Sequence, residues 1–245
     1  MDLLEGWVAR DLTYDGVTHP THRKGSGPGV VIMPEVPGLT PQVMGFAEEV
    51  VAAGYTVVLA QVIGPRGTTR LRPGPVVSAI AKGCVSKEFT TLHAGRRSAV
   101  TDWLRALARD LHAELGGPGV GALGMCFTGG FALAMMLDDA VAAPVLCQPS
   151  LPFPVTPRLG ADVGLSPADL DVVKQRVADG CAVLGLRYTG DKLVGTRFET
   201  LTRELGDGFV RVEFPGRQHS TVTTHRQQAG VDAVLDFFAA RLREA

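Results

Sequence analysis

The sequence predicts one domain spanning residues 1–245, built on a doubly wound, mostly parallel β-sheet with helices on both faces. Short apolar runs alternate along the chain with helical patterns of ten or more residues, and connections of that length join parallel strands. The 245 residues include 30 glycines and 16 prolines, as expected of many short loops between such elements. No internal repeat or linker divides the chain.

The predicted elements follow from local patterns. Short apolar runs predict strands at residues 29–33, 55–60, 119–124, 140–147, 181–188 and 209–214. Apolar residues at helical spacing predict helices at residues 41–53, 95–115, 127–137, 196–205 and 229–243. Another helix is predicted to begin after Ser166, because a proline follows it and Asp169 can complete the cap. Residues 61–92 read as a long loop, and the proline-rich residues 150–165 as a cap over the domain.

The charge balance argues against two classes of partner. Lysine and arginine number 24 and aspartate and glutamate 25, so the formal net charge is −1. No bulk positive field is present to hold nucleic acid or an anionic membrane, and neither partner is expected. Residues 116–137 carry no charge and are long enough to span a bilayer. Seven glycines in that stretch favour a strand, a turn and a helix instead.

The cysteines and the first residues indicate a reducing compartment. The four cysteines, at positions 84, 126, 147 and 181, have no metal-binding spacing, and a chain of this length needs no disulfide staples. The N-terminus lacks the basic start and apolar run of a secretory signal. We therefore expect a cytoplasmic protein with free thiols. His19 and His22 have a ligand-like spacing, but no adjacent cysteine or carboxylate completes a site, so we expect no metal and no cofactor.

Three reactive side chains each follow a predicted strand. Cys126, Asp191 and His219 occur in the order nucleophile, acid, histidine, which is the order in α/β-hydrolase triads. The carboxyl ends of parallel strands meet at one edge of the sheet, so these side chains are expected to lie together there. Asp207 is a rival acid, but it precedes a strand and belongs to the opposite edge. Asp191 also has a plainer interpretation as a turn residue after Gly190.

The segment 124–130 resembles a nucleophile elbow. Small residues there permit a sharp turn from strand to helix, and Cys126 then stands at the helix N-terminus, where free N–H groups favour a thiolate. The backbone N–H of Phe127 would form half of an oxyanion hole. The alternative is a buried structural cysteine, because free cysteines are among the most buried residues.

Glu35 follows the first long apolar strand, at the same predicted edge. In α/β-hydrolases the loop at this point supplies the second oxyanion N–H, which Val36 would provide here. A carboxylate beside a thiol calls for a functional explanation, because its negative charge disfavours the thiolate form. Glu35 is therefore a candidate local base or resting partner for the thiol, and otherwise a solvated loop residue.

Together these residues resemble the dienelactone hydrolase family. The resemblance rests on residues 33–38 and 124–126 with Asp191 and His219, and it extends over residues 28–243. It implies a single-domain α/β-hydrolase fold in which a Cys–Asp–His triad attacks an ester or lactone carbonyl. By analogy Cys126 is the nucleophile, His219 the base and then the acid, Asp191 the orienting group and Glu35 the partner of the thiol.

The chain departs from the family pattern in two places. The family often has two glycines where this chain has Thr128 and Gly129. The dienelactone enzyme also binds its substrate carboxylate with arginines, one of them four residues after the histidine, where this chain has Thr223. Arg66, Arg70, Arg72 or Arg217 are candidate substitutes, with Arg70 and Ser220 taken as the substrate-binding residues.

The leading hypothesis is a hydrolase that cleaves an ester, lactone or thioester of a small molecule through a covalent intermediate on Cys126. Two alternatives stay open. A hydrolase fold can serve as a non-catalytic binding or regulatory protein. A glutaminase-like enzyme also uses a cysteine elbow, but it places a carboxylate two residues after the histidine, where Thr221 stands here. The sequence does not indicate the substrate or the oligomeric state.

Overall fold

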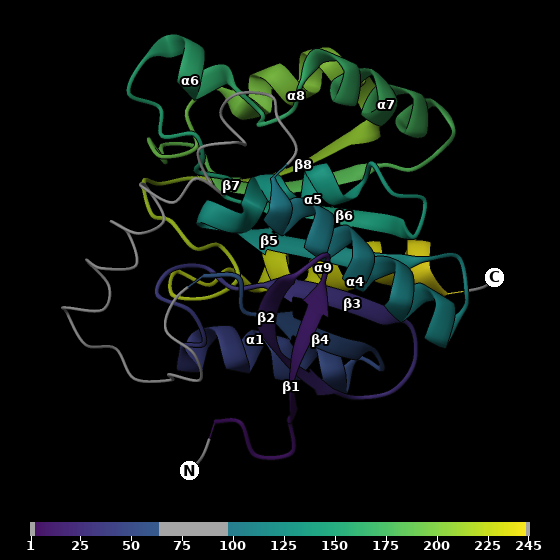
Figure 1. Cartoon of the computed structure of the whole chain (residues 1–245). Coiled ribbons are helices and arrows are strands. Elements are labelled where there is room, and N and C mark those ends of the chain that lie inside the picture. Colours follow the sequence, from purple (N-terminus) through teal and green to yellow (C-terminus); the bar gives the residue numbers. More distant parts are fainter. Residues whose placement is uncertain (1–2, 64–97, 244–245) are drawn as a thin grey trace.

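One mixed β-sheet runs through the centre of the molecule (Figure 1). The computed structural model describes residues 3–63 and 98–243, and the described strands are ordered β1-β2-β4-β3-β5-β6-β7-β8. The strands are β1 (Val8–Tyr14), β2 (Val17–Lys24), β3 (Gly29–Met33), β4 (Thr56–Ala60), β5 (Val120–Met125), β6 (Val141–Cys147), β7 (Val183–Tyr188) and β8 (Phe209–Phe214). Neighbours from β4 to β8 run parallel, and the hairpin of β1 and β2 joins β4 antiparallel.

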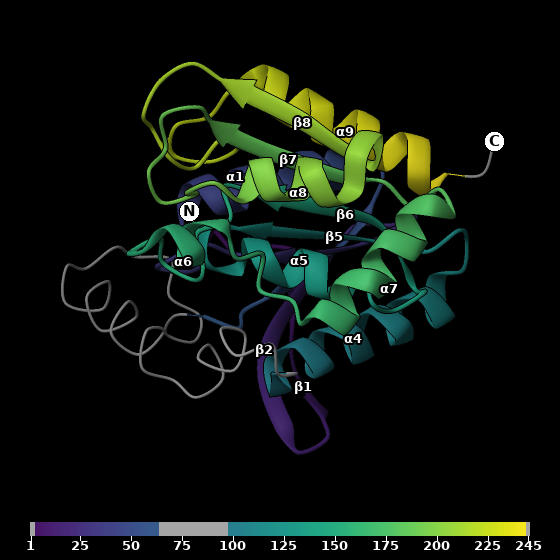
Figure 2. The same ribbon diagram turned by 90° about the horizontal axis from the view of Figure 1, so that it is seen from above.

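Helices cover both faces of this sheet (Figure 2). The helices are α1 (Pro41–Ala52), α4 (Ala99–Leu115), α5 (Gly129–Met135), α6 (Pro157–Ala161), α7 (Pro167–Ala178), α8 (Arg197–Leu205) and α9 (Gln228–Leu242). Side chains of α1 and α9 pack in one apolar core, and side chains of α4, α5, α7 and α8 pack in the other. The predicted fold class, a mostly parallel sheet with helices on both faces, is confirmed.

The predicted elements match the observed ones, with ends that differ by a few residues at most. Ser166 is the N-cap of α7: its hydroxyl accepts from the Asp169 N–H at 3.1 Å and donates to that carboxylate at 2.7 Å. The proline-rich segment contains the short helix α6. Most of the predicted loop at 61–92 lies outside the described residues, and Ser98 caps the start of α4.

The sequence reading missed the N-terminal hairpin. Strand β1 is largely exposed, and Arg10, Asp11 and Thr13 interrupt its apolar residues. It has no uninterrupted apolar run, and only Leu12 and Tyr14 face the core, which is too short an alternation for periodicity to reveal the strand. The strand is formed by its hydrogen-bonded pairing with β2, which runs from Val8 opposite Arg23 to Tyr14 opposite Val17.

The uncharged stretch 116–137 divides as predicted. It contains β5, a short 3₁₀ turn over Cys126–Thr128, and α5. Among the residues that the structure describes, no helix is both long and apolar enough to cross a bilayer. Gly124 and Gly129 lie at the strand-to-helix turn inside the core, whereas Gly116 ends α4.

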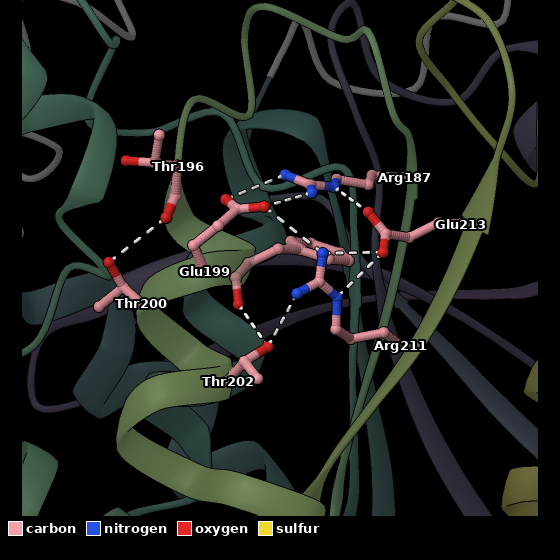
Figure 3. A network of polar contacts seen from close by, with 8 residues as sticks. Arg187, Thr196, Glu199, Thr200, Thr202, Arg211 and Glu213 are labelled. Carbon is pink, nitrogen blue, oxygen red and sulfur yellow. Dashed lines mark hydrogen bonds and ion pairs between the residues drawn. The ribbon is translucent and has the colours of Figure 1, made fainter.

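Charged side chains join α8 to the last two strands (Figure 3). Arg187 of β7 donates to Glu199 of α8 at 2.6 Å and to Glu213 of β8 at 2.7 Å. Arg211 of β8 pairs with the same Glu213 at 2.7 Å. The Arg187 guanidinium also lies 4.5 Å from the ring centre of Phe198, a cation–π distance. This network fixes the helix that follows the β7 loop to the strands on which it packs.

An arginine of α8 holds the proline-rich segment. Arg197 is 2% exposed and donates to six backbone carbonyl oxygens, which belong to Pro149, Pro152, Leu159, Asp162, Leu193 and Val194. Burial lowers the pKa of Arg197 to about 10, against the favourable charge of Asp162, so the side chain stays cationic at neutral pH. One buried cation thus joins carbonyls of the proline-rich segment to carbonyls of the turn before α8.

We predict that Arg197→Met destabilises the fold by at least about 3 kcal/mol, because several buried carbonyls would lose their donor. The free energy of unfolding measured by urea denaturation tests this prediction. Arg203→Met is the matched control on the same helix, since Arg203 is 66% exposed and pairs with its neighbour Glu204. Similar stability of the two variants would contradict the assigned role.

Candidate active site

Cys126 lies at the turn between β5 and α5. The strand ends at Met125, the 3₁₀ turn begins at Cys126, and α5 follows from Gly129. The backbone of Cys126 has a φ of +55°, a left-handed conformation that is uncommon for residues other than glycine. Such a conformation at a strand-to-helix turn is that of the strained nucleophile elbow. The Cys126 side chain is 8% exposed.

The glycines around the turn are required by close backbone contacts. A Cβ on Gly124 would lie 2.1 Å from the carbonyl oxygen of Thr128, across the turn itself. A Cβ on Gly129 would lie 2.7 Å from the Cα of Pro149, in the segment after β6. Neither contact is sterically possible, so both positions need glycine.

Thr128 explains the departure from the family's glycine pattern. Its hydroxyl accepts from the Met125 N–H at 2.9 Å and donates to the Met33 carbonyl at 2.8 Å. The Thr128 hydroxyl therefore closes the turn with one hydrogen bond and joins it to the end of β3 with another. A glycine has no side chain that could form either bond. The close approach in this part of the turn is made by Gly129, one residue later.

Asp191 and His219 form a short hydrogen bond. The Nδ1–H of His219 donates to Asp191 Oδ2 at 2.6 Å, and the acid is buried while the histidine side chain is 20% exposed. The loops after β7 and β8 are also joined through their backbones, with the Gly190 N–H donating to the Gly216 carbonyl at 2.8 Å. The two residues thus meet at the carboxyl edge of the sheet, while Asp207 precedes β8 at the opposite edge.

The environment of His219 favours its protonated form. Burial alone would lower its pKa, but Asp191, together with Cys126, outweighs burial and raises the pKa to about 10. The His219 Nε2 atom makes no hydrogen bond of ordinary geometry. We interpret its interaction with Cys126 as electrostatic and looser than a standard bond, as catalytic pairs often are without substrate.

Glu35 is buried, not solvated. It is 5% exposed, and its carboxylate accepts from the hydroxyls of Ser220, at 2.7 Å, and Thr223 and from the Gln148 amide at 3.4 Å. These bonds all join Glu35 to residues other than Cys126. The position four residues after His219 is therefore occupied by a threonine that binds Glu35, and the role of Glu35 as partner of the thiol stays a prediction.

The candidate oxyanion donors belong to two adjoining turns. Val36 follows Glu35 in a turn that the Gly38 N–H closes on the Glu35 carbonyl at 2.7 Å. Phe127 is the second residue of the 3₁₀ turn, and its ring packs edge-on against Phe153, with centroids 5.2 Å apart. Their function as N–H donors stays a prediction.

The candidate substrate-binding residues have different surroundings. The buried Ser220 hydroxyl is engaged with Glu35, and Arg217 is exposed on the His219 loop. Arg66, Arg70 and Arg72 lie outside the described residues, so their predicted part in binding a carboxylate is unchanged.

The other thiols differ from Cys126 in their surroundings. Burial raises the pKa of Cys147, and nearby Glu35 raises it further, while burial also raises the pKa of Cys181. Both thiols therefore stay protonated at neutral pH. Cys84 lies outside the described residues, within which the three cysteines are free. In residues 3–63 and 98–243 no group of three histidines, cysteines or acids is arranged to hold a metal ion.

Sequence reasoning missed the polar residues behind the triad. Gln148 is fully buried directly after β6, and its side-chain oxygen accepts from both the N–H and the hydroxyl of Thr221. The placement rule that selected Asp191 also applies to Gln148, because it too follows a strand at the carboxyl edge. Gln148 does not stand out in the sequence, because an amide side chain cannot serve as an acid, a base or a nucleophile.

Comparison with known proteins agrees with this geometry. A sequence model of the Dienelactone hydrolase family matches residues 16–169, which include Glu35 and Cys126. The chain belongs to this family. Asp191 and His219 lie beyond the matched residues, so their assignment depends on the strand order and on their hydrogen bond. No curated protein matches the chain by sequence.

Solved structures of several hydrolases share the fold. The dienelactone hydrolase from Anabaena variabilis is 15% identical, with a TM-score of 0.67 over 97% of this chain and 98% of that chain. A dienelactone hydrolase-like promiscuous phosphotriesterase from metagenomic libraries is 17% identical, with a TM-score of 0.65 over 97% and 100%. A cold-adapted esterase from an Arctic intertidal metagenomic library is 20% identical, with a TM-score of 0.62 over 96% and 93%. At these identities the likeness shows the α/β-hydrolase fold.

The His219 pKa leads to a prediction about stability and pH. The pKa of His219 rises from 6.5 to about 10 on folding, so protonated His219 stabilises the folded state. This stabilisation is complete below about pH 6.5 and is lost as the pH rises through about 10. We predict that the free energy of unfolding declines between these values, and that the decline is shallower in Asp191→Asn, whose neutral amide supports the imidazolium less.

Urea denaturation at a series of pH values measures both slopes. Asp207→Asn is the control, because Asp207 precedes β8 at the opposite edge of the sheet. Parallel curves for Asp191→Asn and the wild type would show that Asp191 does not raise the pKa of His219.

Proposed function

We propose that this protein hydrolyses an ester, lactone or thioester of a small molecule, with Cys126 as the nucleophile. The observation that carries the proposal is the 2.6 Å bond between Asp191 and His219 at the sheet edge where Cys126 occupies its left-handed turn. A nucleophile, a base and a residue that orients the base are the parts that covalent acyl transfer requires. Family membership supports hydrolase chemistry, and the cysteine mechanism and the ester substrate are our proposal.

The protonated state of His219 supports attack by the Cys126 sulfur. With a pKa of about 10, His219 carries a proton at neutral pH, and Asp191 stabilises the imidazolium. The Cys126 sulfur attacks the carbonyl carbon, and the developing oxyanion is stabilised by N–H groups that we assign to Val36 and Phe127. As the intermediate collapses, His219 gives its proton to the leaving alkoxide, and an alcohol departs from a thioester on Cys126.

The second half of the reaction returns the enzyme to its resting state. His219, now neutral, removes a proton from water, and the resulting hydroxide attacks the thioester carbon. Collapse of this intermediate breaks the carbon–sulfur bond, releases the carboxylic acid and restores the thiolate beside protonated His219. For a lactone, the alcohol and the acid belong to one ring-opened product.

We predict that Cys126→Ala lowers kcat for nitrophenyl ester hydrolysis by at least about a thousandfold, because the covalent route is lost. Mass spectrometry of the wild type during turnover is expected to detect an acyl group on Cys126. Cys181→Ala is the control, since that thiol is only half-buried and lies before β7, away from the carboxyl edge.

Wild-type turnover by Cys126→Ala would rule out the cysteine mechanism. Absence of both turnover and adduct across a panel of esters, lactones and thioesters would instead favour a binding protein on a hydrolase fold. A bound ligand without chemistry would then be the expected finding.

A further inference from the structure

A buried carboxylate lies behind the triad and its partners define its role. Glu35 is 5% exposed, and both its carboxylate oxygens accept hydrogen bonds. Oε2 accepts from Ser220 at 2.7 Å and from the Gln148 amide at 3.4 Å, and Oε1 accepts from Thr223. A buried charged acceptor with three donors is held firmly, because each bond replaces water that burial removed.

Two of these donors belong to the loop that carries His219. Ser220 is its immediate neighbour and has a left-handed backbone with a φ of +59°. The Ser220 carbonyl accepts from the N–H groups of Thr223 and His225, at 3.3 and 3.2 Å, so the loop folds into a compact turn. His225 Nδ1 also contacts the His219 carbonyl at 2.7 Å. A force on Ser220 or Thr223 is therefore transmitted to the backbone of His219.

Gln148 secures the same loop from a different strand. It follows β6 with a φ of +37°, and its N–H donates to the Leu186 carbonyl of β7 at 2.7 Å. Its side-chain oxygen accepts from the Thr221 N–H at 3.1 Å and hydroxyl at 2.9 Å, while its amide nitrogen faces Glu35. The loop after β8 is thus held by Glu35 from β3 and by Gln148 from β6.

The same carboxylate is adjacent in the chain to the proposed oxyanion donor. Val36 follows Glu35, and the end of β3 is joined to the nucleophile turn by the bond from Thr128 to Met33. Glu35 therefore connects the segment that contains Val36 and contacts the Cys126 turn with the segment that contains His219. These are the two parts whose separation must suit the reacting carbonyl.

We propose that Glu35 is a positioning residue, which fixes His219 relative to Cys126 and Val36 through its bonds to Ser220 and Thr223. This inference rests on the proposed function and differs from a direct action of Glu35 on the thiol. Both carboxylate oxygens are engaged by the His219 loop, and the hydrogen-bond donors to Glu35 in the described part of the chain are Ser220, Thr223 and Gln148.

The test alters Thr223, because its side chain binds Glu35 and takes no part in the proposed chemistry. Thr223→Val keeps the shape and removes the donor, while Thr223→Ser keeps the hydroxyl. We expect Thr223→Val to lower kcat about ten- to a hundredfold, as small displacements of catalytic groups do, with KM changed less than about twofold. We expect Thr223→Ser to restore most of the activity. Thr224→Val is the matched control, because Thr224 is the exposed neighbour.

A second readout does not depend on turnover. The charged groups that set the pKa of His219 are Asp191 and Cys126, and both raise it. If Thr223→Val loosens the loop, the His219 titration followed by NMR shifts to lower pH, and Thr223→Ser returns it towards the wild-type value. Thermal unfolding confirms that each variant is folded, and Ser220→Ala removes the other hydroxyl donor if Thr223→Val does not fold.

The outcomes separate the positioning role from the proposed function. Wild-type kcat and an unchanged His219 titration in Thr223→Val, or equal impairment of Thr223→Ser and Thr223→Val, would overturn the positioning role. Turnover by Cys126→Ala would refute the cysteine mechanism, whereas a shifted His219 titration in Thr223→Val would still support positioning. Loss of stability with normal kcat and titration would show that the bond to Glu35 is structural only.

Discussion

The turn at Cys126 is the constraint on which the rest of the site depends. A left-handed cysteine between β5 and α5 is possible only because Gly124 and Gly129 let the backbone approach itself and Pro149 closely. Thr128 then joins the turn to the end of β3. A sulfur in this position faces the carboxyl edge of the sheet, and every other part of the site is arranged around that edge. The strain is held locally by hydrogen bonds and by packing in the core.

The irregular segments around this edge are held by buried polar groups. Arg197 satisfies carbonyls of the segment after β6, and Glu35 and Gln148 hold the loop after β8. Loops are the mobile parts of most folds, and catalysis needs their side chains within a fraction of an ångström. In this protein, buried hydrogen bonds between the loops hold these side chains in place, because no helix or strand does so there. Such bonds are strong in a low-dielectric interior, and costly to break.

Most of the fold could be predicted from local patterns, and the failures have physical reasons. Apolar runs identified β3 to β7, because strands buried on both faces are mostly apolar. Strand β8 was found from its alternating pattern, in which Arg211 and Glu213 separate apolar residues. The hairpin of β1 and β2 was missed, since both strands mix polar residues with apolar ones and neither contains an apolar run. Cys126, Asp191 and His219 followed from strand order, but Gln148 and Thr223 did not, because amides and hydroxyls have too many ordinary uses to indicate a site.

The sequence by itself determined the strand–helix alternation and the elbow around Cys126, because each depends on residues close together in the chain. It also determined the chain order of the candidate triad, because each member directly follows a strand that its own local pattern predicts. The tertiary structure decided the partners of Glu35. Its carboxylate meets Ser220 and Thr223, which lie more than 180 residues away in the chain, and pattern along one strand carries no information about such contacts. It also decided the role of Thr128, whose hydroxyl found an acceptor on a neighbouring strand. Local sequence thus fixes which groups reach the sheet edge, and packing between loops fixes which of them touch.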